Sequence, residues 1–399
     1  MTWRTSGLPD WPATARPAVA RAAATIGQVS STVIARADNA VAGLTPGYFA
    51  LVMATGILSI GAELEGVTVL STVLLVLCAV VFVLLLALTG LRLVRHRDRI
   101  AEDFLDPARA FGFFTYVAGT NVLGVRLFMS GYHTITAVFL ALTLLAWFVL
   151  GYVVPWTAVL SKTERPVVKY ANGTWFIWVV ASQSVAVAAA TLEPTGESMR
   201  GALAIVAVLS WSVGVFLYAA AGVMVALRMM LYELKPVDLN PPYWVSMGAC
   251  AITVLAGARI VEMAAAPMVD ATRGLVAGLA VVFWSFATWL VPVLFGVGLW
   301  RHWRHRIPLR YEATLWSMVF PLGMYAVAGI YLGQADDLPI VGWIGRAELW
   351  LAMAVWLLVF LSMLRHLYTT VLRRPAADLP SRPATPPTAE GGAGTGPGR

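Results

Sequence analysis

Long apolar stretches recur along the chain and are of two alternating kinds. The stretch 46–62 contains Thr55, Gly56, Ser59 and Gly61 within an otherwise apolar run, whereas residues 73–88 include nothing more polar than Cys78. A helix that faces lipid on all sides has no need of small and polar residues, but a helix that packs against others or lines a pore does. The pattern predicts an all-α polytopic membrane protein with inner and outer helices.

Ten stretches have the length and hydropathy of transmembrane helices. We predict spans at Pro46–Ala62, Val67–Val94, Ala108–Phe128, Thr134–Leu160, Gly173–Thr191, Arg200–Leu231, Pro242–Ala265, Arg273–Trp300, Tyr311–Leu332 and Trp343–Leu372. Residues 46–372 therefore form the membrane domain. Within the preceding segment, 1–45, residues 18–41 fit either a helix on the membrane surface or an unstructured tail. The Pro-, Ala-, Gly- and Thr-rich tail 373–399 cannot form a core and should be disordered.

The odd-numbered spans share a repeated pattern. Each begins near a leading aromatic residue, and these five residues are spaced by 62, 64, 69 and 72 positions: Phe49, Phe111, Trp175, Trp244 and Trp316. Each leading aromatic is followed by small or polar residues inside the helix, whereas the even-numbered spans are more uniformly apolar. The simplest arrangement is five parallel helical hairpins, with the odd helices around a central pore and the even helices against lipid.

Charge determines the predicted orientation. Only 12% of the residues are charged, and most of the 28 Lys and Arg residues lie at the N-terminus, at the C-terminal end and in the links that follow even spans. Basic residues favour the cytoplasmic side, so both termini should be cytoplasmic. The net charge of +7 is spread between apolar runs rather than gathered in one patch, which argues against nucleic-acid binding.

Several polar residues are candidates for a transport path. Near the middle of four odd spans stand Thr55, Asn121, Gln183 and Thr253. They are predicted either to line a pore or to hydrogen-bond neighbouring helices. Two arginines, Arg126 and Arg259, each stand 15 positions after a leading aromatic, near the outer end of a helix. They either attract anions to an outer mouth or serve structural roles, such as snorkelling to the interface or, for Arg259, pairing with Glu262.

The sequence gives no sign of an enzyme. All five histidines lie at span ends or in links, which argues against a haem or metal centre in the membrane, and no phosphate-binding loop motif occurs. The two cysteines are far apart and lie in apolar runs. We therefore expect no catalytic residue and no cofactor, and two classes remain: a transporter or channel, and a membrane receptor or scaffold without transport activity.

Three segments resemble one known family. The segment 46–56, PGYFALVMATG, resembles the first-helix signature of the tellurite-resistance/dicarboxylate transporter family, and 242–249 and 316–321 resemble its seventh and ninth helices. The family includes TehA-like channels, malate and sulfite permeases and slow anion channels. The resemblance implies ten helices as five hairpins around a pore, trimers in the cell membrane, and transport of small anions such as malate, tellurite or sulfite by a channel or carrier. It also implies a gate at Phe320, followed by a helix kink at Pro321; the alternative for Phe320 is a core residue.

Overall fold

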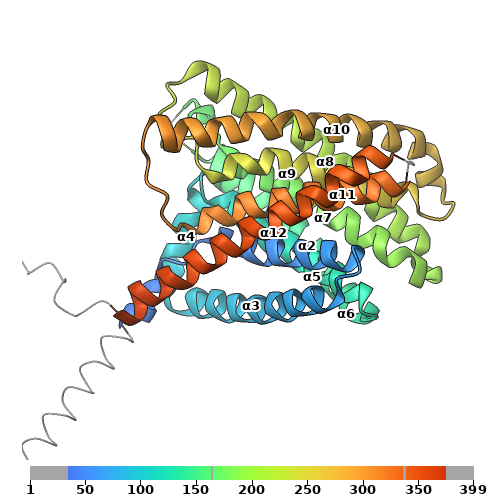
Figure 1. The fold of residues 1–399 in the computed structure, drawn as a ribbon, viewed down its shortest axis with the longest axis horizontal. Coiled ribbons are helices and arrows are strands. Elements are labelled where there is room, and N and C mark those ends of the chain that lie inside the picture. Colours follow the sequence, from blue (N-terminus) through green and yellow to red (C-terminus); the bar gives the residue numbers. More distant parts are fainter. Residues whose placement is uncertain (1–34, 163–164, 336–337, 374–399) are drawn as a thin grey trace, which may run out of the picture. The chain divides into compact units, whose positions relative to one another are not determined.

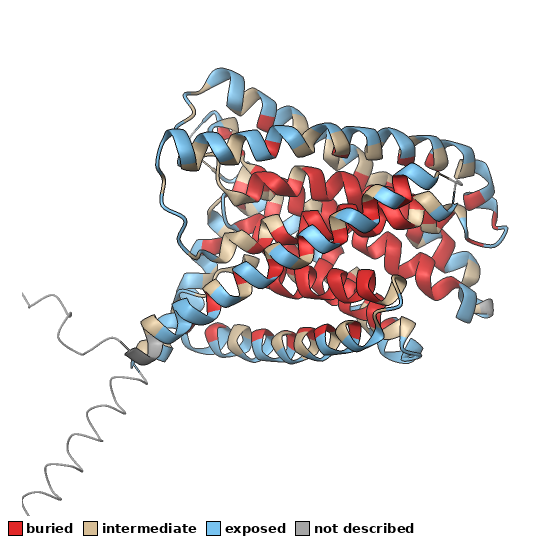
Figure 2. Cartoon of the chain, viewed as in Figure 1, coloured by how far each residue is buried: buried red, intermediate tan, exposed pale blue. Residues whose placement is uncertain are grey.

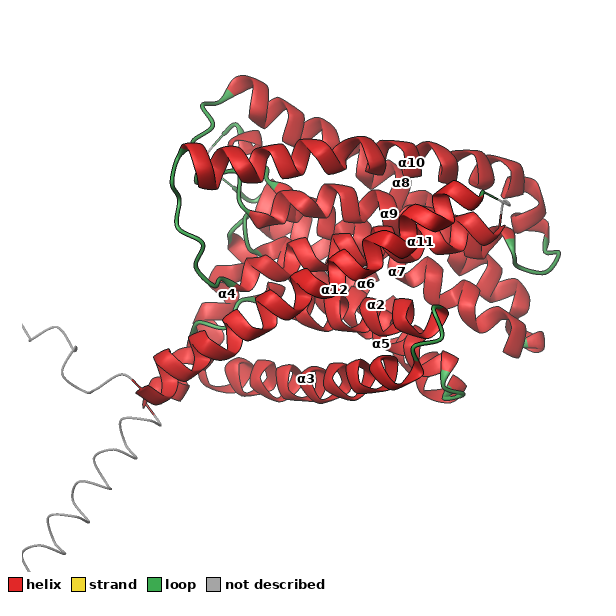
Figure 3. Ribbon diagram, in the orientation of Figure 1, coloured by secondary structure: helices red, strands yellow, loops and turns green. Residues whose placement is uncertain are grey.

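The computed structural model describes residues 35–162, 165–335 and 338–373, and every regular element in these ranges is a helix (Figure 3). Residues Asn39–Leu364 form one compact unit, and the contacts discussed below lie inside it. The predicted surface helix at 18–41 and the predicted disordered tail at 373–399 lie mainly outside the described residues, so both stay predictions.

Each of the five odd spans forms a helix that opens with a 3₁₀ turn. The turns and helices are η1 Pro46–Phe49 and α2 Ala50–Leu64, η2 Ala110–Phe113 and α5 Phe114–Met129, η5 Gly173–Trp175 and α7 Phe176–Leu192, η8 Pro241–Trp244 and α9 Val245–Val261, and η10 Ala313–Leu315 and α11 Trp316–Ala335. Local sequence explains some of these starts. The Thr45 side chain accepts a hydrogen bond from the Gly47 backbone, and Pro46 and Pro241 occupy first-turn positions where no backbone donor is needed.

The even spans form longer helices. They are α3 Thr68–Arg95, α6 His133–Val154, α8 Arg200–Leu231, α10 Pro267–Leu299 and α12 Pro339–Leu367, with π-helical continuations η3 Pro155–Leu160, η9 Trp300–Arg304 and η11 Tyr368–Arg373. The links contain the short helix α4 Arg97–Leu105 and the turns η4 Val167–Tyr170, η6 Glu193–Thr195 and η7 Glu197–Met199.

The five odd-span helices, which we call the inner helices, contact one another in a closed circle. Helix α2 contacts α5, α5 contacts α7, α7 contacts α9, α9 contacts α11, and α11 returns to α2. Figure 1 labels these helices in a view across the bundle. The even-span helices lie outside this circle: α3 packs on α2, α6 on α5, α8 on α7 and α10 on α9. Each of these outer helices thus packs on the inner helix that precedes it in the chain.

Burial separates the two groups of helices (Figure 2). In Gly173–Thr195, 94% of the most apolar stretch is buried, against 17% in Pro267–Arg304. The outer helices expose large apolar side chains such as Phe216 and Trp289, which water would disfavour and hydrocarbon would accept. The outer surface is therefore suited to lipid.

Among the described residues, nine helices are long and apolar enough to cross a membrane. The inner helix of Ala110–Met129 is not in this set, because Asn121 and Arg126 lower its hydropathy. The predicted all-α polytopic membrane fold is confirmed. The count of ten spans and their arrangement as parallel hairpins stay predictions.

Small residues allow the helices to approach closely. A Cβ atom on Gly345 of α12 would lie 2.6 Å from the carbonyl oxygen of Ala326 on α11, and one on Gly173 would lie 2.2 Å from the oxygen of Pro242. Neither position has room for a side chain. Because apolar side chains gain little by leaving lipid for another apolar surface, close van der Waals packing of this kind is what holds membrane helices together.

Candidate functional site

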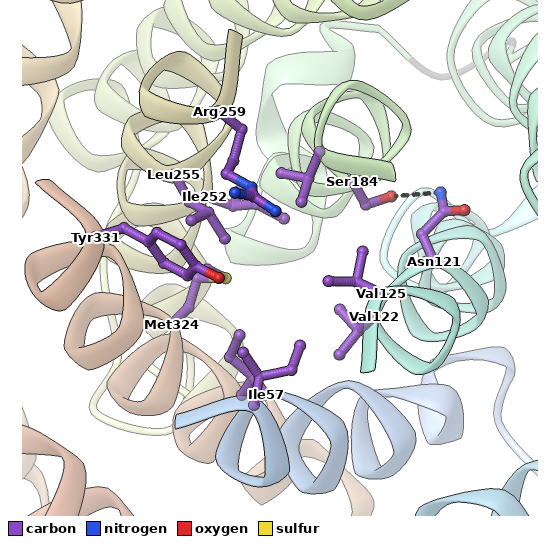
Figure 4. A pocket seen from close by; sticks show the side chains of 12 residues that line it. Ile57, Asn121, Val122, Val125, Ser184, Ile252, Leu255, Arg259, Met324 and Tyr331 are labelled. Carbon is purple, nitrogen blue, oxygen red and sulfur yellow. Dashed lines mark hydrogen bonds between the residues drawn. The ribbon is translucent and has the colours of Figure 1, made fainter. Parts of the chain in front are cut away.

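A small cavity of about 20 Å³ lies inside the circle of inner helices (Figure 4). Its wall receives side chains from all five inner helices: Ile57 and Ile60 from α2, Asn121, Val122 and Val125 from α5, Ser184 and Val187 from α7, Ile252, Leu255 and Arg259 from α9, and Met324 and Tyr331 from α11. We call this space the central cavity. No single helix, and no single hairpin, could form it.

The cavity wall follows the sequence repeat. Ile57, Ile252 and Met324 each stand eight residues after the leading aromatic of their helix, and Arg259 and Tyr331 each stand fifteen residues after it. Residues spaced by three, four and seven positions share one face of a helix, so these side chains point to the same axis at successive depths. The deeper layer is aliphatic, and the charge stands at the end where the inner helices finish.

One polar group interrupts the aliphatic wall. The Asn121 side-chain nitrogen donates to Ser184 Oγ at 3.0 Å, and the Asn121 oxygen accepts from Thr143 Oγ1 on α6 at 2.7 Å. These two bonds hold the amide between α5, α6 and α7, with Asn121 and Ser184 both on the cavity wall (Figure 4). The wall thus offers a hydrogen-bonding site of fixed orientation.

Arg259 places a positive charge at the end of the cavity. Its guanidinium lies 5.2 Å from the centre of the Tyr331 ring, and its Nη1 lies 3.0 Å from Glu262 Oε2. The Arg259 side chain keeps 26% of its surface exposed and that of Glu262 43%, so water weakens this ion pair. The charge of Arg259 therefore remains available to an approaching anion.

Arg126 stands at the same position of the repeat but points elsewhere. Its guanidinium donates to Glu63 Oε2 at 2.8 Å and also to the hydroxyls of Ser59, Ser71 and Ser130. The Arg126 side chain is only 3% exposed and does not line the central cavity. These contacts join α2, α3 and α5, as the structural interpretation of Arg126 expects, and its role in transport stays a prediction.

Three of the four polar candidates for pore lining are not on the cavity wall. The Thr55 hydroxyl accepts a hydrogen bond from Trp356 Nε1 on α12 at 3.1 Å. The Gln183 amide donates to the backbone oxygen of Trp211 on α8 at 3.2 Å. Thr253 Oγ1 donates to the backbone of its own helix. Thr55 and Gln183 thus bond neighbouring helices, and only Asn121 of the four reaches the cavity wall.

Phe320 is a buried residue on the same helix as two cavity residues, Met324 and Tyr331. It stands one helical turn before Met324 on α11, so the two side chains share a face, and Phe320 is only 1% exposed. It is not itself a lining residue of the cavity. The next residue, Pro321, packs against Gly248 of α9, where a Cβ atom would lie 2.9 Å from Pro321 Cγ.

Most of the lining residues that sequence reasoning missed are apolar, and the polar ones among them are Ser184 and Tyr331. It selected polar residues near mid-span, whereas the wall also includes apolar residues such as Ile57, Leu255 and Met324. The signal that could have found them is the repeat itself. Stepping back from Arg259 by four and then three residues gives Leu255 and Ile252, which are both on the wall. Within the described residues, no three His, Cys, Asp or Glu side chains come together as a metal site.

The comparisons with known proteins agree with this architecture. The model of the voltage-dependent anion channel family matches residues 43–364, which include all five inner helices. An uncharacterized transporter of Methanocaldococcus jannaschii is 23% identical over 336 residues, covering 82% of this chain and 95% of that protein. An uncharacterized membrane protein of Mycobacterium tuberculosis is 61% identical over 158 residues, covering 40% of this chain and 80% of that protein. Since the family model covers most of the chain, the chain belongs to the voltage-dependent anion channel family.

Proposed function

We propose that the protein conducts small anions through the central cavity, entering or leaving past Arg259. The observation that carries this proposal is the wall of the cavity, which is built by all five inner helices and is apolar except for Asn121, Ser184, Arg259 and Tyr331. A fixed cation inside the path would hold an anion tightly, whereas conduction requires sites that bind weakly enough to release it. An aliphatic path with a cation at one end is better suited to conducting an anion than to binding it tightly.

The proposal includes the orientation and assembly expected from sequence. Ten spans form five parallel hairpins, both termini are cytoplasmic, and Arg259 lies near the outer face of the cell membrane. The family resemblance supports a homo-oligomer, with a trimer as the expected form. Malate, tellurite and sulfite are the candidate anions.

Phe320 is the proposed gate. Three observations support this proposal: Phe320 is buried, it stands one helical turn before the cavity residue Met324, and the next residue, Pro321, packs against Gly248 of α9. An apolar ring across the axis would exclude water and therefore ions. Pro321 removes a backbone donor from the helix, which loosens or kinks it next to the ring.

The test is anion flux from purified protein in liposomes, measured for a panel of anions with imposed potential and pH gradients. We expect Phe320→Ala to raise flux per folded protein. Phe82→Ala is the matched control: the Phe82 ring is also buried, but it packs between Phe49 and Phe139 away from the cavity. That variant should lose about 3–5 kcal/mol of stability without gaining flux, using the soluble-core value as a guide.

The outcomes separate the alternatives. If Phe320→Ala lowers stability as Phe82→Ala does and leaves flux unchanged, Phe320 is a core residue rather than a gate. If no anion of the panel crosses with either protein, the alternative of a receptor or scaffold without transport activity is favoured.

A further inference from the structure

A second hollow, separate from the central cavity, lies between the C-terminal end of α10 and the N-terminal ends of α9 and α11. Its volume is about 340 Å³, and it is lined mainly by apolar side chains, among them Leu294, Val297, Leu315 and Met318, together with the polar residues Arg301 and Asn240. We call it the α10 groove. It is formed partly by an outer helix, so it borders the surface that faces lipid.

The rim of the α10 groove is basic and aromatic. Trp303 is 82% exposed and Leu309 is 78% exposed, although both are apolar. Beside them, Arg304, Arg306 and Arg310 are exposed in the link after α10. Tryptophan next to arginine is typical of a membrane–water interface, where the ring meets the headgroups and the cations attract anionic lipid.

Two polar atoms at the groove have unmet hydrogen-bonding capacity. Arg301 Nη1 donates to the Leu239 backbone at 2.8 Å, but its Nε is buried with no partner within the described residues. Asn240 Oδ1, an acceptor, is likewise buried and without a partner there. A ligand that supplies an acceptor for Arg301 and a donor for Asn240 would satisfy both, after a small adjustment of these side chains.

We infer that the α10 groove binds an anionic phospholipid with a hydroxylated headgroup, of which phosphatidylglycerol is the simplest example. The phosphate lies against Arg301, a headgroup hydroxyl donates to Asn240, and an acyl chain lies along Leu294, Val297 and Met318. Basic pockets between transmembrane helices are known to hold such headgroups, and the length of the apolar lining suits a hydrocarbon chain. This inference does not depend on the transported anion.

Two glycines of α10 provide a matched pair for the test. Gly298 lines the groove and Gly296 does not, and a Cβ atom at either position would meet no atom within 4 Å. Both Gly298→Phe and Gly296→Phe should therefore fold. The full-length protein, delipidated in detergent, is titrated with phosphatidylglycerol or phosphatidylcholine, and bound lipid is counted by native mass spectrometry.

We expect the wild type and Gly296→Phe to retain phosphatidylglycerol in preference to phosphatidylcholine. Gly298→Phe should weaken that binding about tenfold, because displacing about two methylenes of a buried chain accounts for this factor. Arg301→Gln should weaken it about fivefold and reduce the preference for phosphatidylglycerol, while Arg304→Gln, outside the groove lining, changes it less.

Three results would overturn the inference. The first is equal retention of phosphatidylglycerol by Gly298→Phe and Gly296→Phe. The second is displacement of the lipid by millimolar inorganic phosphate, which would identify a site for a free anion. The third is a change of oligomeric state in Gly298→Phe with lipid retention unaltered, which would identify the groove as a contact between copies of the chain.

Discussion

The Arg126 guanidinium lies 2.8 Å from the Glu63 carboxylate and joins the end of α5 to the end of α2. The same guanidinium donates to Ser71 at the start of α3, so one side chain connects three helices. The sequence repeat places Arg126 and Arg259 at equivalent positions, yet only Arg259 lines the central cavity. The two arginines should therefore respond differently to the same substitution.

Arg126→Gln should lower the stability of the folded protein by roughly 3 kcal/mol, because it leaves Glu63 and several hydroxyls without their donor in a buried site. The matched control is Arg346→Gln, since the Arg346–Glu65 pair has the same chemistry but the Arg346 side chain is 50% exposed. Its loss should cost at most about 1 kcal/mol. Thermal unfolding in detergent measures both. Equal destabilisation by the two variants would contradict the assignment of Arg126 as a structural clamp.

Arg259→Gln should reduce anion flux by about tenfold at low ionic strength and much less at high salt. The attraction that it removes acts over about 30 Å at 0.01 M salt but only about 3 Å at 1 M. Arg126→Gln, normalised to folded protein, should leave the salt dependence as in the wild type. Liposome flux measured across this salt range is the check. A deficit in Arg259→Gln that is the same at every salt concentration would exclude long-range attraction as its cause.

Thr55→Val should cost about 1–3 kcal/mol of stability without changing flux per folded protein. The substitution leaves Trp356 Nε1 as a buried donor without its acceptor, and the Thr55 side chain does not reach the cavity. The double variant with Trp356→Phe removes the donor as well and should recover part of the loss. If Thr55→Val instead alters flux or anion selectivity, Thr55 contacts the permeating ion in some state of the protein.

Gly248→Ala should destabilise the protein by about 1–3 kcal/mol, because the added methyl group would lie 2.9 Å from Pro321 Cγ in a packed interior. Gly274→Ala on α10 is the control, since a Cβ atom there meets no neighbour within 4 Å, and alanine is the better helix former. Thermal unfolding compares them. Because Gly248 supports α11 beside the proposed gate, flux per folded protein should also change in Gly248→Ala and not in Gly274→Ala.

The predicted orientation can be tested with single cysteines. The natural residues Cys78 and Cys250 are buried, so the wild type should give little background labelling. Tyr132→Cys, in the exposed link after α5, should react in intact cells with an impermeant thiol reagent, and Glu102→Cys in α4 should not. If Glu102→Cys is labelled and Tyr132→Cys is not, the orientation in the membrane is the opposite of the predicted one.

The sequence by itself determined the class of fold and the division into inner and outer helices. Hydrophobic length fixes which segments can enter a bilayer, and the small and polar residues between Thr55 and Gly61 mark a helix that packs on other helices rather than on lipid alone. These are properties of single segments, so no knowledge of neighbours is needed. The repeat of leading aromatics likewise identified all five helices that form the closed circle.

Only the tertiary structure decided which side chains face the central cavity. Thr55 and Ile57 are two residues apart on α2, which places them about 200° apart around the helix axis, so that Thr55 forms a hydrogen bond to α12 while Ile57 lies on the cavity wall. Arg126 has a long side chain that can point in several directions. The carboxylate of Glu63, on another helix, determined the direction in which the Arg126 guanidinium points. The direction of each side chain depends on contacts between segments that are far apart in the sequence. Hydropathy and residue spacing give no information about these contacts.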